Sequence, residues 1–110
     1  MEEKFDIEQF QNYCEKKVNN AFDELEKSMP KWGTPSEYRR KSSDIFRMQK
    51  TLYNLLFHIA DKITSYKQLV KTLESLKENC HYDPDTENKN AYQNYWKISI
   101  DALIKEIQES

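Results

Sequence analysis

Apolar residues in the first thirty positions recur at the spacing of an α-helix. Successive members are three or four residues apart: Ile7, Phe10, Cys14, Val18, Ala21, Leu25 and Met29. Such steps place side chains on one face of a helix, and Tyr13 and Phe22 widen that face. The pattern predicts a first helix from Asp6 to Ser28, ended by Pro30, which cannot continue a helix.

The start of a second helix is signalled by the sequence Thr34-Pro35-Ser36-Glu37, which has the form of a capping box. The Thr34 hydroxyl can accept a hydrogen bond from the backbone N–H of Glu37, and the Glu37 side chain can bond back to the N–H of Thr34. Pro35 suits the first helical position because the N–H that it lacks would have no helical partner there. We therefore expect this helix to begin at Pro35.

The central part of the chain has an apolar residue at every seventh position: Ile45, Leu52, Ile59, Tyr66, Leu73 and Cys80. Neither Gly nor Pro interrupts residues 36–83. The seven-residue spacing does not shift anywhere along this stretch, which favours one continuous helix. The usual length of helices in compact domains favours a break. A break would fall near Thr64 and Ser65, where Ser65-Tyr66-Lys67-Gln68 resembles a helix cap. Both alternatives remain open at this point.

Residues 46–60 also carry apolar side chains on the opposite side of this helix. Phe46, Tyr53 and Phe57 face away from the row of Ile45, Leu52 and Ile59, given the 100° turn per residue. A helix that is apolar on two sides lies centrally or at an interface. We predict Phe46, Tyr53 and Phe57 as a self-association face; the alternative is that the first and last helices cover them.

The C-terminal segment predicts a last helix from Ala91 to Gln108. Its apolar residues again step by three or four: Tyr92, Trp96, Ile100, Leu103 and Ile107. Before it, Asp83-Pro84 offers a helix start, although residues 85–90 are polar enough for a loop. With 110 residues and a single Gly, we expect one all-α domain over residues 1–110. The expected architecture is an antiparallel helical bundle of three long or four shorter helices.

Charge, hydropathy and cysteine content indicate where in the cell this domain is found. The net charge is −2, no apolar run is long enough to span a membrane, and the acidic N-terminus lacks the apolar region of a signal peptide. We therefore expect a cytoplasmic protein with no membrane association. Cys14 and Cys80 both fall on apolar helical rows, which predicts reduced, buried thiols rather than a disulfide.

Residues with catalytic or metal-binding chemistry are few and poorly spaced. The sequence has no CxxC, HxxxH or HExxH motif, and Cys80 and His81 are adjacent, which rarely lets both reach one ion. His58 lies three residues before Asp61, a spacing equally typical of a surface pair. We predict no catalytic residue, no metal site and no cofactor, and therefore not an enzyme.

A basic segment with aromatic residues is the strongest candidate for partner binding. Residues 31–50 carry six bases and two acids, whereas residues 1–30 carry eight acids and four bases. Cations can contact phosphates, and Trp or Tyr can stack on unpaired bases, but the same groups suit an acidic protein. The predicted contact residues are Trp32, Tyr38, Arg39, Arg40, Lys41 and Arg47.

These features together predict a small protein that binds another macromolecule and regulates or inhibits it without catalysis. A protein partner is the first expectation, since Tyr, Trp and Arg are enriched at protein interfaces. By analogy of fold alone, accessory proteins of phages and mobile elements have this profile. The alternatives are a nucleic-acid-binding module that uses residues 31–50 and a structural homo-oligomer, such as a homodimer.

Overall fold

A computed structural model describes residues 5–28 and 44–109, and the regular secondary structure in these ranges is all helical. Those two ranges contain no strand, a single short 3-10 helix, η1 (Ala60–Lys62), and four α-helices: α1 (Ile7–Ser28), α3 (Asp44–Ile59), α4 (Tyr66–Lys77) and α5 (Lys89–Glu109). The predicted all-α class is confirmed, and the version with four shorter helices applies. The predicted capping box at residues 34–37 lies outside the described residues.

The break near Thr64 and Ser65 is confirmed, and local hydrogen bonds account for it. Helix α3 tightens into η1, and the chain then becomes extended at Ile63 and Ser65. The Ser65 Oγ accepts a hydrogen bond from the backbone N–H of Gln68 at 3.2 Å. The Gln68 Oε1 in turn accepts from the backbone N–H and the hydroxyl of Thr64, both at 2.8 Å. This reciprocal cap starts α4, so the seven-residue period continues through a turn.

Side-chain caps also fix the starts of α1 and α5. The Asp6 carboxylate accepts from the N–H of Gln9 at 3.0 Å. Asp6 therefore caps α1, which begins at Ile7, one residue after the predicted start. The Asn88 Oδ1 accepts from the N–H of Ala91 at 3.0 Å, so α5 begins two residues before the predicted start at Ala91. Asp83-Pro84 does not begin a helix; it forms a turn, because the Asp83 carbonyl accepts from the N–H and hydroxyl of Thr86.

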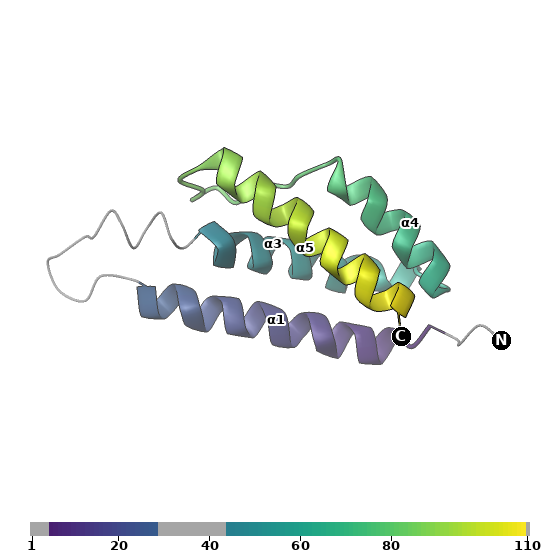
Figure 1. Cartoon of the computed structure of the whole chain (residues 1–110). Helices are drawn as coiled ribbons and strands as arrows, with labels where there is room; N and C mark the ends of the chain where they lie inside the picture. The colour runs from purple at the N-terminus through teal and green to yellow at the C-terminus, as the bar shows by residue number, and fades with distance from the viewer. Residues whose placement is uncertain (1–4, 29–43, 110) are drawn as a thin grey trace, which may run out of the picture.

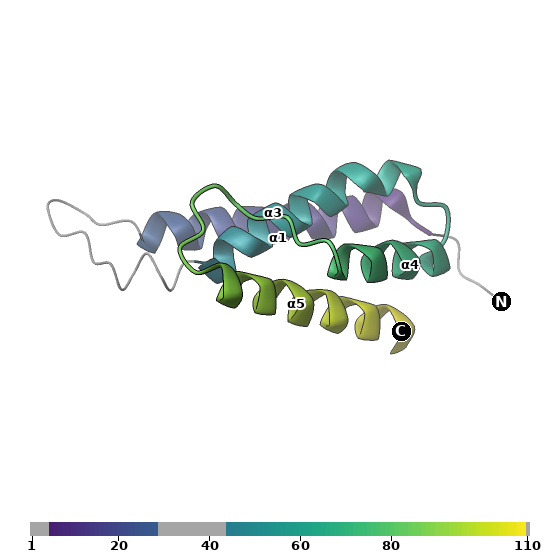
Figure 2. The ribbon, with the colours of Figure 1, turned by 90° about the horizontal axis from the view of Figure 1, so that it is seen from above.

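Successive helices run in opposite directions and form two layers (Figure 1). Helix α3 contacts α1 on one side and α5 on another, and α4 contacts α5. Seen from above, α1 and α3 form one layer and α4 and α5 the other, with the connection between α4 and α5 passing over α3 (Figure 2). The antiparallel bundle is therefore confirmed, with α3 at its centre.

The core lies between the two layers and is dominated by large apolar side chains. Its fully buried members include Met48, Leu52, Leu56, Leu69, Leu73, Tyr92, Trp96 and Ile100. The Trp96 Nε1–H donates to the carbonyl of Leu76 at 2.8 Å and the Tyr92 hydroxyl to the carbonyl of His81 at 2.6 Å. These two bonds attach α5 to the end of α4 and to the connection that follows it. Both buried aromatic groups thus have polar partners.

Candidate functional site

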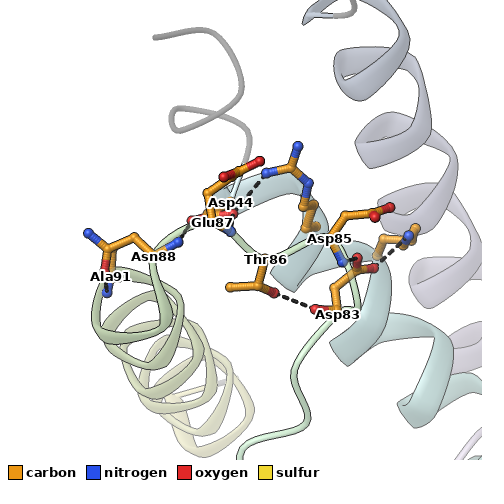
Figure 3. Close-up of polar contacts among 9 residues, drawn as sticks. Asp44, Asp83, Asp85, Thr86, Glu87, Asn88 and Ala91 are labelled. Carbon is orange, nitrogen blue, oxygen red and sulfur yellow. Dashed lines mark hydrogen bonds and ion pairs between the residues drawn. The ribbon is translucent and has the colours of Figure 1, made fainter. Parts of the chain in front are cut away.

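A polar cluster, the Asp44–Asp83 clamp, holds the α4–α5 connection against α3. We define it as Asp44, Arg47, Lys50 and Asp83 with the backbone N–H groups that they bind (Figure 3). Asp44 begins α3 and is fully buried. Its carboxylate accepts from the N–H of Glu87 at 3.0 Å and of Asn88 at 2.7 Å, and from Arg47 Nη1 at 2.8 Å. Asp44 therefore positions Asn88, the residue that caps α5.

Asp83 forms the second half of the clamp. Its carboxylate contacts Lys50 Nζ at 2.7 Å and accepts from the N–H of Asp85 at 2.8 Å. Burial alone would raise the pKa of Asp83, but the Lys50 ammonium and the Asp85 N–H outweigh it, so the pKa lies below its ordinary value. Asp83 is therefore a carboxylate at neutral pH, and the connection is tied to α3 at two places.

One of the six predicted partner-binding residues belongs to the clamp. Five of them lie outside the described residues: Trp32, Tyr38, Arg39, Arg40 and Lys41. The sixth, Arg47, is bound to Asp44, and its side chain is 12% exposed. Lys50, which extends the basic segment in the sequence, is bound to Asp83. The two described cations at the end of this segment thus form ion pairs within the molecule.

An open groove, the α1–α3 groove, lies beside the clamp. It has a volume of about 430 Å³ and three walls, formed by α1, α3 and the α4–α5 connection. Its lining combines three apolar side chains with five polar ones: Val18, Phe22, Lys50, Thr51, Asn54, Leu55, His58 and His81. The volume falls within the range of small ligand-binding clefts. This groove is the candidate functional site.

Phe22 places an exposed aromatic ring in the lining of the groove. It was predicted to widen the buried face of the first helix, but that prediction is wrong, because its side chain is 53% exposed. The Lys50 ammonium lies 5.6 Å from the centre of the Phe22 ring, within the range of a cation–π contact. Sequence reasoning missed the groove. The available signal was the row Glu8, Glu15, Phe22, spaced by seven residues and polar until it reaches Phe22.

The predicted self-association residues differ in exposure. Tyr53 is 6% exposed, and its ring meets that of Tyr13 on α1 edge-on with 6.0 Å between centroids. Burial raises the pKa of both phenols. Phe46 and Phe57 are half-buried, and Phe57 packs against the core. For Tyr53 the structure therefore favours coverage by the first helix, and self-association stays a prediction.

The cysteine and histidine side chains have separate surroundings. Cys14 is a free, fully buried thiol whose pKa is raised by burial to about 12, as expected of an inert core thiol. Cys80 is also free but only half-buried, and it follows the end of α4 instead of lying on a helical row, which corrects that part of the prediction. Among the described residues, no three His, Cys, Asp or Glu side chains are grouped so that they could hold a metal ion.

The two histidines both reach the groove, from different elements. His58 lies on α3, and His81 stacks on Trp96 at 5.8 Å from the α4–α5 connection. The carboxylate of Asp61, which the sequence suggested as a partner of His58, accepts instead from Gln11 Nε2 at 3.1 Å. This bond joins η1 to α1 and leaves His58 as an exposed residue of the groove.

The chain was compared with protein-family models, with curated proteins and with solved structures, and none of the three comparisons gives a match. The fold and the site therefore have to be interpreted from their own geometry. None of the helices in the described ranges is both long and apolar enough to cross a membrane.

Proposed function

We propose that the protein binds another protein through the α1–α3 groove and acts by that binding, as a regulator or inhibitor, without catalysis. One observation carries the proposal: a large aromatic side chain, Phe22, is 53% exposed at a groove of about 430 Å³. Exposed apolar groups that adjoin a concave surface with a polar rim are typical of interaction sites. Most described apolar side chains of comparable size are at least half-buried.

The composition of the groove supports binding of a peptide segment. Val18, Leu55 and Phe22 offer an apolar surface, and Thr51, Asn54 and the two histidines offer hydrogen-bonding groups around it. Interfaces combine these features in an apolar centre and a polar rim. The walls of the groove belong to α1, α3 and a connection that is clamped to α3, so the site is largely formed before a partner arrives.

The alternatives draw less support from the described residues. A nucleic-acid-binding module would use residues 31–50, and Arg47 and Lys50 of that segment already pair with buried aspartates. A homo-oligomer would use Phe46, Tyr53 and Phe57, of which Tyr53 is buried under α1. Both stay predictions behind the protein-binding proposal.

Affinity capture with matched baits tests the proposed function. The wild-type protein, Phe22→Ala and Ile98→Ala are each used to capture proteins from lysate of the organism that makes this chain. Ile98 is a suitable control because it is 62% exposed and lies on α5, away from the groove lining. We expect a protein that the wild type and Ile98→Ala retain and Phe22→Ala loses. Equal capture by all three baits, or no captured protein, would contradict binding through the groove.

A further inference from the structure

We infer that the occupant of the α1–α3 groove is a basic segment of the partner protein that also presents an apolar side chain. This inference rests on the proposed function and adds the chemistry of the partner. It starts from the surface of α1 that adjoins the groove. The exposed positions between residues 6 and 26 include one base, Lys16, and five acids: Asp6, Glu8, Glu15, Asp23 and Glu26.

Helix geometry places three acids of α1 in one row with Phe22, which lines the groove. Glu8 and Glu15 precede Phe22 by fourteen and seven residues, and Glu26 follows it by four. Residues at these spacings lie within about 40° of one another around a helix that turns 100° per residue. The three carboxylates therefore lie in one row with Phe22 on α1, and all three residues are exposed. Glu15 and Glu26 are the two members of this row nearest to Phe22, whereas Glu8 lies roughly 21 Å from Phe22 along the helix, at 1.5 Å per residue.

Among the described side chains, the cations near the groove do not offset this row. Lys50 lines the groove, but its ammonium is bound to the Asp83 carboxylate at 2.7 Å. Lys17 lies on the other side of α1, where its ammonium is 5.6 Å from the centre of the Tyr13 ring and 6.0 Å from that of Tyr53. On the α3 side, the exposed acid Asp61 follows His58 by three residues. The charge that the described residues leave at the rim is therefore mainly negative.

A partner with Lys or Arg side chains beside an apolar anchor complements both features. Its apolar residue would contact Val18, Leu55 and the ring of Phe22, and its cations would lie over Glu15 and Glu26. An Arg or Lys could also lie over the exposed face of the Phe22 ring. Nucleic acid is disfavoured at this site, because a row of carboxylates repels phosphates.

Three labelled peptides of equal length and identical leucine positions provide the probes. The positions between the leucines are all Lys in the first, all Glu in the second and all Gln in the third. Binding to the full chain is measured by fluorescence anisotropy. We expect the Lys peptide to bind and the Glu peptide not to bind. Affinity for the Lys peptide should fall at least ~10-fold between about 0.01 M and about 0.15 M salt, as the screening length shortens from ~30 Å to ~8 Å.

Charge reversal separates the groove from general attraction to acidic surfaces. The double variant Glu15→Lys, Glu26→Lys should weaken binding of the Lys peptide at least ~10-fold at low salt. Glu74→Lys on α4 with Glu78→Lys at its C-cap changes the net charge by the same amount at exposed positions outside the groove lining, and should weaken binding less than ~3-fold. Phe22→Ala should weaken it as well. Circular dichroism confirms that each variant folds.

Several results would overturn the inference. One is that the Glu peptide binds more tightly than the Lys peptide, and another is that the two charge-reversed proteins lose equal affinity for the Lys peptide. A third is a dimer, detected by light scattering, that Phe22→Ala converts to monomer, because the occupant of the groove would then be a second copy of the chain. The proposed function fails separately. If no peptide binds but a captured partner still depends on Phe22, the inference is wrong and the protein-binding function stands. If no partner depends on Phe22, the function itself is wrong.

Discussion

The Asp44–Asp83 clamp and the α1–α3 groove share α3 but differ in how completely their side chains are paired. In the clamp, two aspartates that are almost fully buried accept hydrogen bonds from three backbone N–H groups and contact two cations. In the groove, Phe22, Asn54 and His58 are exposed to solvent. No buried side-chain nitrogen or oxygen in the described ranges lacks a partner, so the clamp is complete within the molecule.

This difference separates residues that stabilise the fold from residues that are available to a partner. Removing a paired, buried carboxylate leaves its donors without an acceptor, so its effect should appear in the free energy of unfolding. Removing an exposed aromatic ring should instead affect binding. The comparison can be tested by substitutions, from those expected to destabilise the fold most to those expected to destabilise it least.

Asp44→Ala should have the largest effect, because two backbone N–H groups and the Arg47 guanidinium lose the same buried acceptor. We expect the free energy of unfolding to fall by about 3 kcal/mol, measured by urea unfolding with circular dichroism. Asp101→Ala is the control, since the Asp101 carboxylate pairs with Lys77 between α5 and α4 but is 56% exposed. Its unfolding midpoint should stay almost unchanged. Equal shifts for the two variants would contradict the role of the clamp.

Trp96→Phe should have the next largest effect. The substitution keeps an aromatic ring in the core but removes the Nε1–H that donates to the Leu76 carbonyl at 2.8 Å. The Leu76 carbonyl keeps a second donor, the N–H of Asn79 at 2.9 Å, which limits the loss. We expect a decrease of roughly 1–2 kcal/mol in the free energy of unfolding. Tyr95→Phe, on the same helix and half-buried, should change it less; a larger effect there would show that the indole bond contributes little.

The Asp83–Lys50 ion pair predicts a dependence of stability on acid pH. Since the folded state lowers the pKa of Asp83, the native protein binds this proton less readily than the unfolded chain. The stabilisation is therefore fully present above the unfolded pKa of about 4 and is lost as the pH falls through the lower folded value. Asp83→Asn should destabilise the protein by roughly 1 kcal/mol at neutral pH, with a gap that closes on acidification.

Urea unfolding at a series of pH values measures this gap. The matched control is Asp85→Asn, because Asp85 contributes its backbone N–H to Asp83, and its own carboxylate is exposed. The control should follow the wild-type pH profile. A constant gap between wild type and Asp83→Asn at every pH would mean that Asp83 acts through its shape and not through its charge.

The fold was predictable from the sequence where the determining contacts are local. The cap at Ser65 depends on Gln68, three residues later, and the break between α3 and α4 was therefore visible as a short motif. The Asp44 carboxylate binds N–H groups 43 and 44 residues away. No periodicity reports a contact of that kind, which is why the sequence left a helix start at Asp83 and a loop over residues 85–90 as alternatives and could not predict the turn in the clamp.

The groove was harder to predict than the fold because its three walls come from distant parts of the chain. His81 joins the groove only because the α4–α5 connection is held over α3. The exposure of Phe22 was the part that could have been inferred. Glu8 and Glu15 place its row on the solvent side of α1, whereas the apolar spacing of Val18 and Leu25 suggested that Phe22 extended the buried face.

Phe22→Ala should have the smallest effect on stability. Part of the ring is buried, but alanine favours the helix more than phenylalanine does, and the two contributions oppose each other. We expect the free energy of unfolding to change by no more than ~0.5 kcal/mol, the usual size for surface substitutions. Ile98→Ala, at a position that is 62% exposed on α5, should change it equally little. If Phe22→Ala cost more than ~2 kcal/mol, Phe22 would behave as a core residue. A negligible change would mean that any partner lost by Phe22→Ala was lost because the ring contacts it.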